Sequence, residues 1–534
     1  MKNIDVVIVG AGVAGGLVAD ALVTKGHRVL VLEAGPENQN RGQLLERYFS
    51  DPNRSFDSAY PSHPEAPRPA ANGQDGYYVQ KGTTPFSSTY ERRVGGTSWH
   101  WHGLTPRFMP NDFRMQSMYQ VGVDWPISYG DLEPWYCAAE KELNVSGGNN
   151  TDFGSPRSQP FPYPSQRQSP LDLHIKQAIK GTFFNNVELD VRPNRAARNP
   201  KICQGSANCM PICPTGAKYE AITHINRARV KGVIIRSKAV ATRVEIDKEG
   251  DVSTIHYKTW DGRKHKVRAK MFILAANAIE TPKLLLMSAR EGNVNVANSS
   301  DQVGRNLMDH PAQLSIALAK EPIDAYRGPQ STSVIMSFRD GDFRKTEGGF
   351  RVEIFNSGSN TFSGPDRTVA TMIDANLVGE ELQQALKNRA SREFILLGET
   401  EQMPDPENRV LLSSEKQDAF GLPHPELHYS HDNYATKGLA KIKKFNEFVF
   451  EKVGASDVFH LPFILGSGHI MGTTRMGNNP NESVVDVNLQ SHDHPNLFIV
   501  GSGVFPTGAT ANPTLTIAAL SLRLADYVHG RLSK

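Results

Sequence analysis

The N-terminal part of the chain alternates short apolar runs with a glycine-rich break. An apolar run follows Asp5 and ends at Val9, a helical pattern continues to Lys25, and a second apolar run covers residues 28–32. Short apolar runs bounded by glycines are typical of buried parallel strands, and the longer periodic segment between them is typical of a helix. The pattern therefore predicts a βαβ unit.

Later apolar runs predict further strands of the same sheet. Residues 270–277 form one such run, and the helix after it is expected to have Thr281 as its N-cap and Pro282 as its first residue. Residues 494–501 predict another buried strand, followed by a loop and by a helix that starts at Pro513. Strands that alternate with helices in this way predict the α/β class.

The glycines of the first turn carry a dinucleotide-binding pattern. Gly10 permits a tight turn, Gly12 lets the backbone approach a pyrophosphate, and Gly15 lets helix and strand pack closely. Glu33 ends the second strand and could bind a ribose hydroxyl. A purely structural glycine turn is the alternative, and the pattern alone does not distinguish NAD from FAD.

Composition narrows the class of protein. The 534 residues are 39% hydrophobic and 22% charged, with a net charge of +3 and scattered basic residues, which does not indicate a nucleic-acid partner. No apolar run approaches the roughly 18 residues of a transmembrane helix, and a strand and turn explain the N-terminus better than a signal peptide. Four cysteines do not form a disulfide framework, and Cys137 is expected to be a small buried hydrophobe.

Three of the four cysteines, Cys203, Cys209 and Cys213, lie in one short run that Pro214 follows. Thiolates at such spacings bind zinc or iron–sulfur clusters. Three local ligands favour a [3Fe–4S] cluster, which carries electrons singly, so a flavin suits this chain better than nicotinamide. A zinc site with His224 as fourth ligand, and unliganded core cysteines, are the alternatives.

Two further segments support a flavin site. The turn at residues 94–101 contains adjacent glycines whose backbone N–H groups could meet a phosphate or a ring oxygen, although a plain loop is the alternative. Asn512 lies at the mouth of the last helix, whose N-terminus would stabilise negative charge on a reduced flavin. A simple N-cap role is the alternative for Asn512.

Together these segments resemble one family, the glucose–methanol–choline (GMC) oxidoreductases, over essentially the whole chain. The resemblance rests on the first glycine turn with Glu33 and on residues 94–100, 275–282, 468–477 and 512–513. It implies His469 as the catalytic base and Asn512 as a second group on the substrate oxygen. It places FAD against Gly10, Gly12, Gly15, Glu33, Gly95, Gly96, Thr97, Ser98, His100, Thr281, Asn512 and Pro513. His100 is either bonded covalently to the flavin or packed against it.

Within the family, the three cysteines are similar to the cluster ligands of bacterial membrane-associated sugar dehydrogenases. This implies a small export subunit, a multihaem cytochrome c and a place on the periplasmic face of the inner membrane; a cytoplasmic enzyme with a soluble acceptor is the alternative. The chain departs from that group at Gln204, where a second cysteine is expected, and at Ser467 and Gly468, where an Asn-Asn pair is expected.

The resemblance also divides the chain into a Rossmann-type FAD-binding domain and an interleaved α+β substrate domain, the GMC fold. The FAD-binding domain is expected at 1–45, 80–110, 200–310 and 465–534, and the substrate domain at 46–79, 111–199 and 311–464.

The expected function is oxidation of a hydroxyl of a sugar, glycoside or sugar acid, with hydride passing to flavin N5 and electrons leaving through the cluster. Arg475 could bind an acidic substrate or pair within the scaffold. The alternatives are a flavin oxidase that uses oxygen, with zinc or nothing on the cysteines, and an inactive nucleotide-binding partner.

Overall fold

The computed structural model describes residues 4–534, apart from 39, 53–54, 56, 71–75, 149–152, 293 and 357–364. All of the predicted site residues lie in the described part. The predicted domain segments include some positions outside it.

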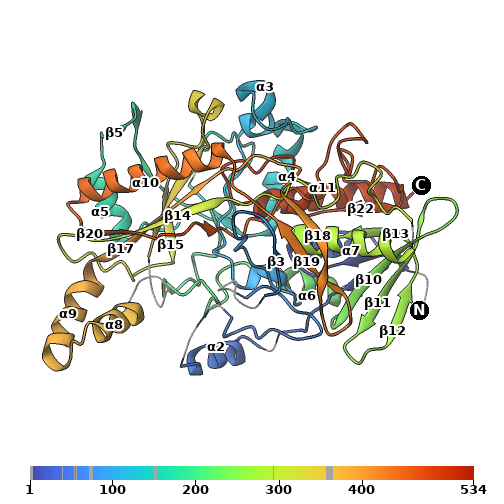
Figure 1. Cartoon of the computed structure of the whole chain (residues 1–534), viewed down its shortest axis with the longest axis horizontal. Coiled ribbons are helices and arrows are strands. Elements are labelled where there is room, and N and C mark those ends of the chain that lie inside the picture. The colour runs from blue at the N-terminus through green and yellow to red at the C-terminus, as the bar shows by residue number, and fades with distance from the viewer. Residues whose placement is uncertain are drawn as a thin grey trace.

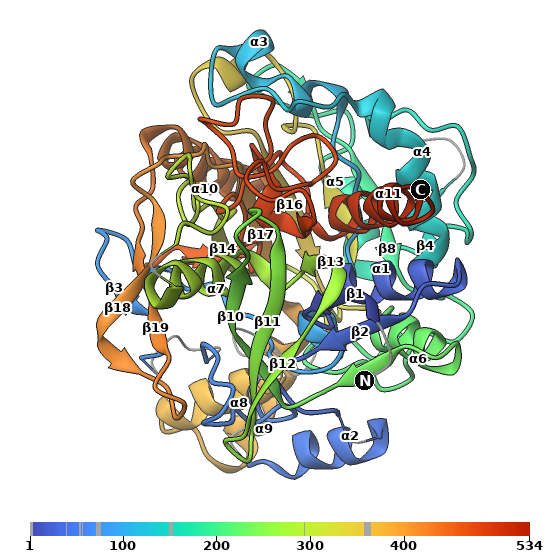
Figure 2. The ribbon, with the colours of Figure 1, turned by 90° about the vertical axis from the view of Figure 1, so that its right-hand side faces the viewer.

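A five-stranded parallel sheet forms one half of the molecule (Figure 2). Its order is β22 (Leu497–Ile499), β13 (Ala269–Leu274), β1 (Ile4–Val9), β2 (Val29–Leu32) and β9 (Ile234–Arg236). Helix α1 (Val13–Thr24) connects β1 to β2, which pair in parallel, so the predicted βαβ unit is confirmed. The two later predicted strands are also present, as β13 and β22 beside β1.

The helix after β13 starts earlier than predicted. Helix α7 runs over Asn277–Gly292, and the Asn277 side chain accepts hydrogen bonds from the backbone N–H groups two and three residues further on. This is the N-cap arrangement, so the prediction that Thr281 caps the helix is wrong. Thr281 is instead a residue within α7, and its side chain is buried.

Pro282 therefore lies inside a helix, where it cannot donate a backbone hydrogen bond. The carbonyl that would have received that bond belongs to Ala278. The Thr473 hydroxyl donates to this carbonyl at 2.6 Å, which replaces the missing helical bond. A contact from a distant segment thus makes the proline tolerable, and no local signal predicts it.

A seven-stranded antiparallel sheet forms the other half (Figure 1). Its order is β20 (Ser456–His460), β14 (Pro311–Leu318), β17 (Glu393–Thr400), β16 (Phe350–Phe355), β15 (Ser331–Ile335) and β7 (Val191–Pro193), with β21 (Leu465–Gly466) beside β14. Its strands come from residues assigned to the predicted substrate domain, except β21, and the predicted domain division stays a prediction.

Helix α10 (Asn433–Val453) covers one face of the antiparallel sheet (Figure 1). It buries Leu439, Ile442 and Phe445, at helical spacing, in one apolar cluster with Phe394 of β17. Because side chains alternate along a strand, the odd-numbered residues of β16 and β17 point to the opposite face of the sheet. That face is free to form the wall of a cavity.

Smaller elements complete the fold. The remaining strands are β10 (Ala239–Ile246), β11 (Val252–Thr259), β12 (Lys264–Val267), β18 (Arg409–Gln417), β19 (Pro423–His428), β3 (Val79–Gln80), β4 (Val145–Ser146), β8 (Ala196–Ala197), β5 (Phe183–Phe184) and β6 (Val187–Glu188). The remaining α-helices are α2 (Arg41–Ser50), α3 (Met115–Tyr119), α4 (Tyr129–Glu142), α5 (Pro170–Ala178), α6 (Ile222–Val230), α8 (Pro365–Asp374), α9 (Gly379–Arg392) and α11 (Thr514–Leu532). The short 3₁₀ helices are η1 (Gly96–Trp99), η2 (Pro110–Phe113), η3 (Asp342–Lys345) and η4 (Ser502–Val504).

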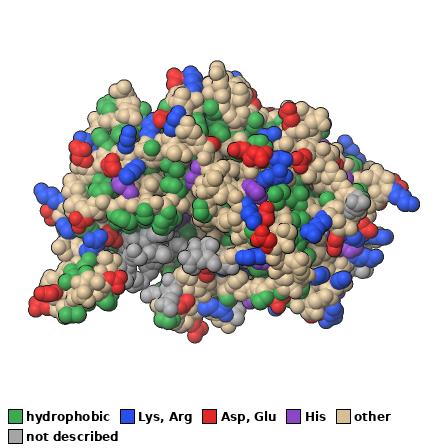
Figure 3. Space-filling model, in the orientation of Figure 1, with side chains coloured by type: hydrophobic (Ala, Val, Ile, Leu, Met, Phe, Trp, Pro, Cys, Tyr) green, Lys and Arg blue, Asp and Glu red, His purple; other side chains and the backbone are tan. Residues whose placement is uncertain are grey.

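Both chain ends lie at the end of the molecule formed by the parallel sheet (Figures 1 and 2). Helices α8 and α9 project from the opposite end (Figure 1). Acidic and basic side chains are interspersed over the face drawn in Figure 3. Within the described residues, no helix is long and apolar enough to cross a bilayer.

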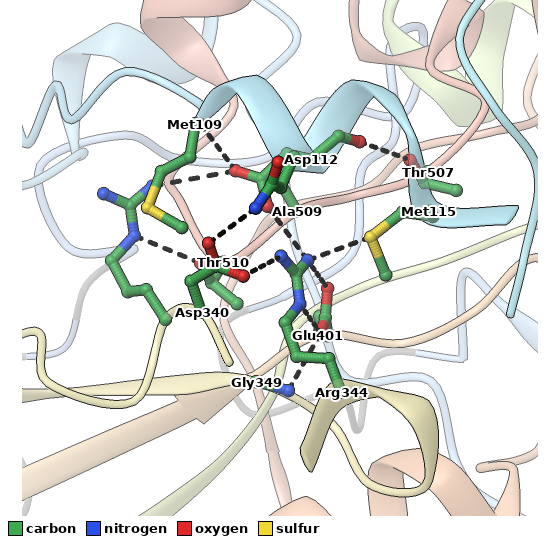
Figure 4. Close-up of polar contacts among 12 residues, drawn as sticks. Met109, Asp112, Met115, Asp340, Arg344, Gly349, Glu401, Thr507, Ala509 and Thr510 are labelled. Carbon is green, nitrogen blue, oxygen red and sulfur yellow. Dashed lines mark hydrogen bonds and ion pairs between the residues drawn. The ribbon is translucent and has the colours of Figure 1, made fainter. Parts of the chain in front are cut away.

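A buried ion cluster lies beside the C-terminal loop at Ala509 and Thr510 (Figure 4). The Arg344 guanidinium lies 2.9 Å from Asp112 and 2.7 Å from Glu401, and the side chains of all three are fully buried. The Glu401 carboxylate also accepts the backbone N–H of Gly349 at 2.8 Å. The cluster therefore connects η2, η3 and the segments next to β16 and β17 at one point beside Thr510, which Figure 4 places next to it.

Candidate active site

One cavity of about 490 Å³ extends from the first glycine turn to the antiparallel sheet. Gly10, Gly12 and Glu33 line one end, and His469 and Asn512 line the cavity as well. Residues of β14, β16 and β17 supply a further part of its wall. The cavity thus brings the predicted nucleotide site and the predicted catalytic pair into one space.

The glycine turn fits the approach of a phosphate. Gly10 has φ +108°, and a Cβ there would lie 2.4 Å from the Ala275 carbonyl oxygen. A Cβ on Gly12 would meet no protein atom within 4 Å and would occupy open space at the cavity wall. Gly15 packs so closely that its Cβ would lie 2.0 Å from the Gly10 oxygen. The turn at Gly10 and the close packing at Gly15 are as the sequence pattern predicts, and the approach of a pyrophosphate to Gly12 stays a prediction.

Glu33 is buried at the end of β2, beside this turn. Its carboxylate accepts the backbone N–H of Ala11 at 2.9 Å and that of Gly35 at 3.0 Å. Burial raises the pKa of Glu33, although these two hydrogen bonds oppose the shift. The residue lines the cavity, and its contact with a ribose stays a prediction.

The second glycine turn folds directly onto the first. Gly95 has φ +98° and donates its backbone N–H to the Ala11 oxygen at 2.8 Å. Gly96, Thr97 and Ser98 follow in η1 and line the cavity. The hydroxyls of Thr97 and Ser98 hold the surrounding backbone in place. The turn is thus a fixed part of the cavity wall and no free loop.

His100 also lines the cavity, with Nδ1 3.2 Å from Glu91 Oε1. Burial opposes ionisation of Glu91, but His100, Arg68 and Arg93 outweigh it and lower its pKa to about 2. The ionised Glu91 lies beside Nδ1, although the two atoms do not meet in hydrogen-bond geometry. His100 Nε2 is then the ring nitrogen that can react or pack elsewhere.

His469 lies between His310 and Asn512. His469 Nδ1 is 2.8 Å from His310 Nδ1, and His469 Nε2 is 3.0 Å from Asn512 Nδ2. His310 Nε2 lies 2.8 Å from the Ala509 carbonyl oxygen, which can only accept a hydrogen bond. His310 therefore carries its proton on Nε2, and its Nδ1 accepts the Nδ1 proton of His469. This leaves the lone pair of His469 on Nε2, the nitrogen beside Asn512.

Both imidazoles are held neutral. Burial, with the nearby charges of His310 and Arg351, lowers the pKa of His469 well below 6.5. Burial likewise lowers the pKa of His310. Burial with Lys218 and Arg198 lowers the pKa of a third cavity residue, His102, to about 3. A neutral His469 is ready to accept a proton at physiological pH.

Asp309 holds the two histidine-bearing segments together. One carboxylate oxygen accepts the backbone N–H of His310 at 2.7 Å and that of His469 at 3.0 Å. The other oxygen is hydrogen-bonded to the Ser88 hydroxyl, which accepts the Gly468 backbone N–H at 2.7 Å. Burial raises the pKa of Asp309 to about 7.

Neither Asp309 nor His310 received a role from the sequence. Both lie just before Pro311, and an acid next to a histidine before a strand was the available signal. Their importance depends on the approach of His469, which is 159 residues away from His310 in the chain. No local pattern gives that contact.

Asn512 does not cap the last helix. Helix α11 starts at Thr514, with Pro513 as its N-cap residue and without a side-chain cap hydrogen bond. Asn512 Nδ2 contacts His469 instead, and its buried Oδ1 has no hydrogen-bond partner. An unpaired buried oxygen here suits a ligand that donates a hydrogen bond. Asn512, Pro513 and Thr514 all line the cavity.

The three clustered cysteines are free thiols beside the cavity, which Met210 of the same segment lines. Burial raises the pKa of Cys203, whereas the backbone and charge of Lys218 outweigh burial and lower the pKa of Cys213. Arg198 donates to Cys209 Sγ at 3.2 Å. Within the described residues, however, no three His, Cys, Asp or Glu side chains are arranged to hold a metal ion.

Two other candidate ligands have different partners. His224 contacts the Tyr219 hydroxyl at 2.8 Å and Glu142 at 3.0 Å, so both ring nitrogens are occupied and the Cys₃His zinc alternative is not formed. Cys137 is half-buried and lies 3.1 Å from Glu133 and from Arg107. It is therefore part of a polar cluster, and the prediction of a buried hydrophobe is wrong.

Two further predicted residues lie away from the cavity wall. Thr281 lies within α7 and its side chain is buried, whereas its neighbour Glu280 lines the cavity. Arg475 donates to the Glu482 carbonyl at 2.8 Å and has a scaffold role. Among the described lining residues, neither Thr281 nor Arg475 is present.

Comparison with protein families gives two matches. Residues 180–312 and residues 404–521 match the N- and C-terminal models of a family described as GMC oxidoreductase. The chain is similar to the fructose dehydrogenase large subunit of Gluconobacter japonicus, at 37% identity over 98% of this chain and 97% of that one. It is also similar to the gluconate 2-dehydrogenase flavoprotein of Pantoea cypripedii, at 23% identity over 100% and 95% of the two chains.

A solved structure shows the same fold. The chain superimposes on pyridoxine 4-oxidase from Mesorbium loti with a TM-score of 0.68 over 99% of each chain, at 19% sequence identity. The mixed arrangement of one parallel and one large antiparallel sheet is therefore the arrangement of a known flavoenzyme fold.

Proposed function

Because the chain belongs to the GMC oxidoreductase family, whose members bind FAD and act on CH–OH groups, we propose that it oxidises a hydroxyl group of a sugar-type substrate. The observation that carries this proposal is the hydrogen-bonded series from the Ala509 carbonyl through His310 to His469 and Asn512. It ends at the cavity in one basic nitrogen and one amide, which is the pair that an alcohol group needs.

The cavity residues fit FAD. The open space at Gly12, the turn at Gly96, where a Cβ would lie 3.0 Å from the Gly12 Cα, and the carboxylate of Glu33 would hold the pyrophosphate and the ribose. The N-terminus of α11, at Thr514, would lie toward the ring that gains negative charge on reduction. When bound, FAD supplies the hydride acceptor.

The protein's own residues handle the proton. His469 is neutral because its pKa is depressed, so Nε2 can take the hydroxyl proton as the carbon–hydrogen bond breaks. A bound hydroxyl would take the place of Asn512 Nδ2 on His469 Nε2, and Nδ2 would then donate one of its two N–H groups to the same oxygen. His310 Nδ1 accepts the hydrogen bond from the Nδ1 proton of His469 throughout, which keeps the lone pair on Nε2 directed at the substrate.

Anaerobic mixing of the purified flavoprotein with a panel of sugars, glycosides and sugar acids tests this function. Bleaching of the flavin by at least one of them is the expected result. A protein without flavin, or a flavin that no member reduces, would contradict it. Readmission of air then separates a dehydrogenase, which reoxidises slowly, from the oxidase alternative, which reoxidises fast.

We further propose that electrons leave through a [3Fe–4S] cluster on Cys203, Cys209 and Cys213. The support is three free thiols in one segment at the cavity, beside the cations of Arg198 and Lys218 that stabilise thiolates. The thiols would have to move together to bind the cluster. Iron and sulfide analysis tests this, and Cys209→Ser should leave substrate-dependent flavin reduction intact while slowing transfer to an acceptor.

His100 is proposed as a covalent attachment site for the flavin. The support is that His100 lines the cavity while its Nδ1 lies 3.2 Å from Glu91 Oε1. After acid precipitation, flavin fluorescence should stay with the wild-type protein and be released from His100→Ala. Free flavin in the wild-type supernatant would instead indicate simple packing.

A small export subunit and a multihaem cytochrome c are proposed as partners on the periplasmic face of the inner membrane. The support is the similarity to a protein named as a large subunit. Cell fractionation with and without the genomic neighbours tests this proposal. Full activity in the cytoplasm that does not change when the neighbours are deleted would contradict it.

A further inference from the structure

The antiparallel sheet presents two carboxylates to the cavity. Glu353 of β16 pairs with Leu397 of β17, and Leu397 pairs in turn with Leu314 of β14, so all three share one face of the sheet. Glu399 lies two residues after Leu397 and therefore faces the same way. All four residues line the cavity. This face is opposite to the one that α10 covers.

One guanidinium serves both carboxylates. Arg351 lies directly across from Glu399 in the sheet register and forms an ion pair with it. It also lies 2.6 Å from Glu353 Oε1, while the Ser331 hydroxyl donates to Glu353 Oε2 at 2.7 Å. The side chains of the three charged residues are at most 7% exposed. The wall therefore holds two acidic groups and one basic group.

No further permanent cation faces this part of the wall among the described lining residues. Arg92 and Lys283 also line the cavity, but they lie 3.8 and 3.7 Å from Glu280, away from the sheet. The histidines that the charge of Arg351 reaches are His469, His310 and His102, and all three are neutral because burial lowers their pKa values. The sheet wall near His469 is thus net acidic.

The charge already present opposes a further anion. Burial raises the pKa of Glu399, and the neighbouring Glu353 adds to the shift, although Arg351 opposes it. A position that resists its own negative charge also resists the carboxylate of a bound molecule. A hydroxyl group, by contrast, can donate to a carboxylate oxygen in a charge-assisted hydrogen bond.

We propose that Glu353 and Glu399 are specificity-determining residues that accept hydrogen bonds from hydroxyl groups of a neutral polyhydroxy substrate and exclude sugar acids. This rests on the proposed function and narrows its substrate class. His469 and Asn512 act on the hydroxyl group that is oxidised, whereas the two carboxylates determine which molecules bind beside them. Gln330, which also lines the cavity, adds a neutral polar group to the same wall.

Anaerobic stopped-flow reduction of the flavin by D-fructose and by D-gluconate tests the proposal. For the wild-type protein we expect the second-order rate constant for reduction by D-gluconate to be at least about tenfold lower than the constant for D-fructose. A factor of this size corresponds to the loss of one hydrogen bond. Glu353→Gln and Glu399→Gln should each raise the D-fructose concentration needed for half-maximal reduction by about tenfold and should narrow the discrimination against D-gluconate. The limiting rate should change less.

Glu415→Gln is the matched control, because Glu415 is exposed on β18, pairs with Lys81, and lies away from the cavity. If D-gluconate reduces the wild-type flavin as fast as D-fructose or faster, this proposal is overturned, whereas the proposed oxidation of a hydroxyl group still stands. Unchanged concentration dependence in a flavin-loaded Glu353→Gln or Glu399→Gln protein would overturn it as well. If a wider panel of neutral and acidic sugars all fail to reduce the flavin, the proposed function fails instead.

Discussion

At the residue scale, the chemistry depends on the direction of one lone pair. The Ala509 carbonyl fixes the proton of His310, and His310 fixes the proton of His469. These contacts leave His469 Nε2 beside Asn512 as the basic atom. A backbone oxygen, separated from the substrate by His310 and His469, therefore determines which ring nitrogen of His469 carries the proton.

The pH dependence of flavin reduction follows from the depressed pKa of His469. The neutral imidazole is the active form, so the rate should fall only when the pH drops through that pKa. Because burial places the pKa well below 6.5, the rate constant should be constant through neutral pH. Stopped-flow measurements across the pH range check this. An acidic limb centred at or above pH 6.5 would contradict it.

His310 is expected to act as a positioning residue. His310→Leu removes the acceptor for the Nδ1 proton of His469 and should slow flavin reduction by about tenfold, the value of one hydrogen bond. His310→Gln offers a carbonyl oxygen at the same place and should recover part of the rate. If both variants retain flavin and show equal rates, the tautomer argument is wrong.

At the element scale, Asp309 joins the start of β14 to the segment that carries His469. Burial raises its folded pKa to about 7, above the usual value of 3.8. The folded state therefore holds a proton that the unfolded chain has lost, and stability falls as the pH rises toward 7.

Asp309→Asn removes that titration. Relative to this variant, the wild-type protein should lose about 2 kcal/mol of unfolding free energy between pH 5.5 and pH 8.5. Urea denaturation at the two pH values measures the difference. If the difference in unfolding free energy between the two proteins is the same at both pH values, or if the wild-type protein gains stability relative to the variant as the pH rises, Asp309 is not protonated in the folded state.

The buried ion cluster is expected to matter for stability. Arg344→Met leaves Asp112 and Glu401 without their cation and should lower the unfolding free energy by about 3–5 kcal/mol. Lys345→Met removes the neighbouring exposed pair with Asp342 and should cost at most about 1 kcal/mol. Urea denaturation of both variants makes the comparison, and equal losses would contradict it.

Elements differ in how far the sequence predicts them. The βαβ unit was predictable because apolar runs and glycines lie next to each other in the chain. The start of α7 was not, because Thr281 and Pro282 imitate a helix start, whereas Asn277 supplies the cap and distant Thr473 replaces the lost hydrogen bond. The residues around Thr281 and those around Asn277 both resemble a helix start. Contacts with distant segments determine which of the two forms the start of α7.

The candidate site divides in the same way. Gly10, Gly12 and Glu33 were predictable from spacing, and His469 with Asn512 came from a family resemblance. His310 and Glu353 were not predicted, because each acquires its role from strands and loops distant in the chain. Only the antiparallel sheet, whose pairing the sequence does not reveal, places Glu353 at the cavity.

At the scale of the whole molecule, function arises where two different sheets meet. The parallel sheet ends in glycine turns that fit a dinucleotide, and the antiparallel sheet supplies a polar wall. The C-terminal loop before α11 brings Asn512 into the wall of the cavity between the two sheets. The nucleotide end and the substrate end are therefore built by separate parts of one fold.

The most direct test of the central claim compares single-turnover flavin reduction in the wild-type protein and in His469→Ala, each first checked for bound flavin. Both are mixed anaerobically with the sugar that reduces the wild-type flavin fastest. Loss of a positioned base should slow the reduction by at least about a hundredfold while the flavin stays bound. A rate for His469→Ala within a few-fold of the wild-type rate would remove His469 from the mechanism.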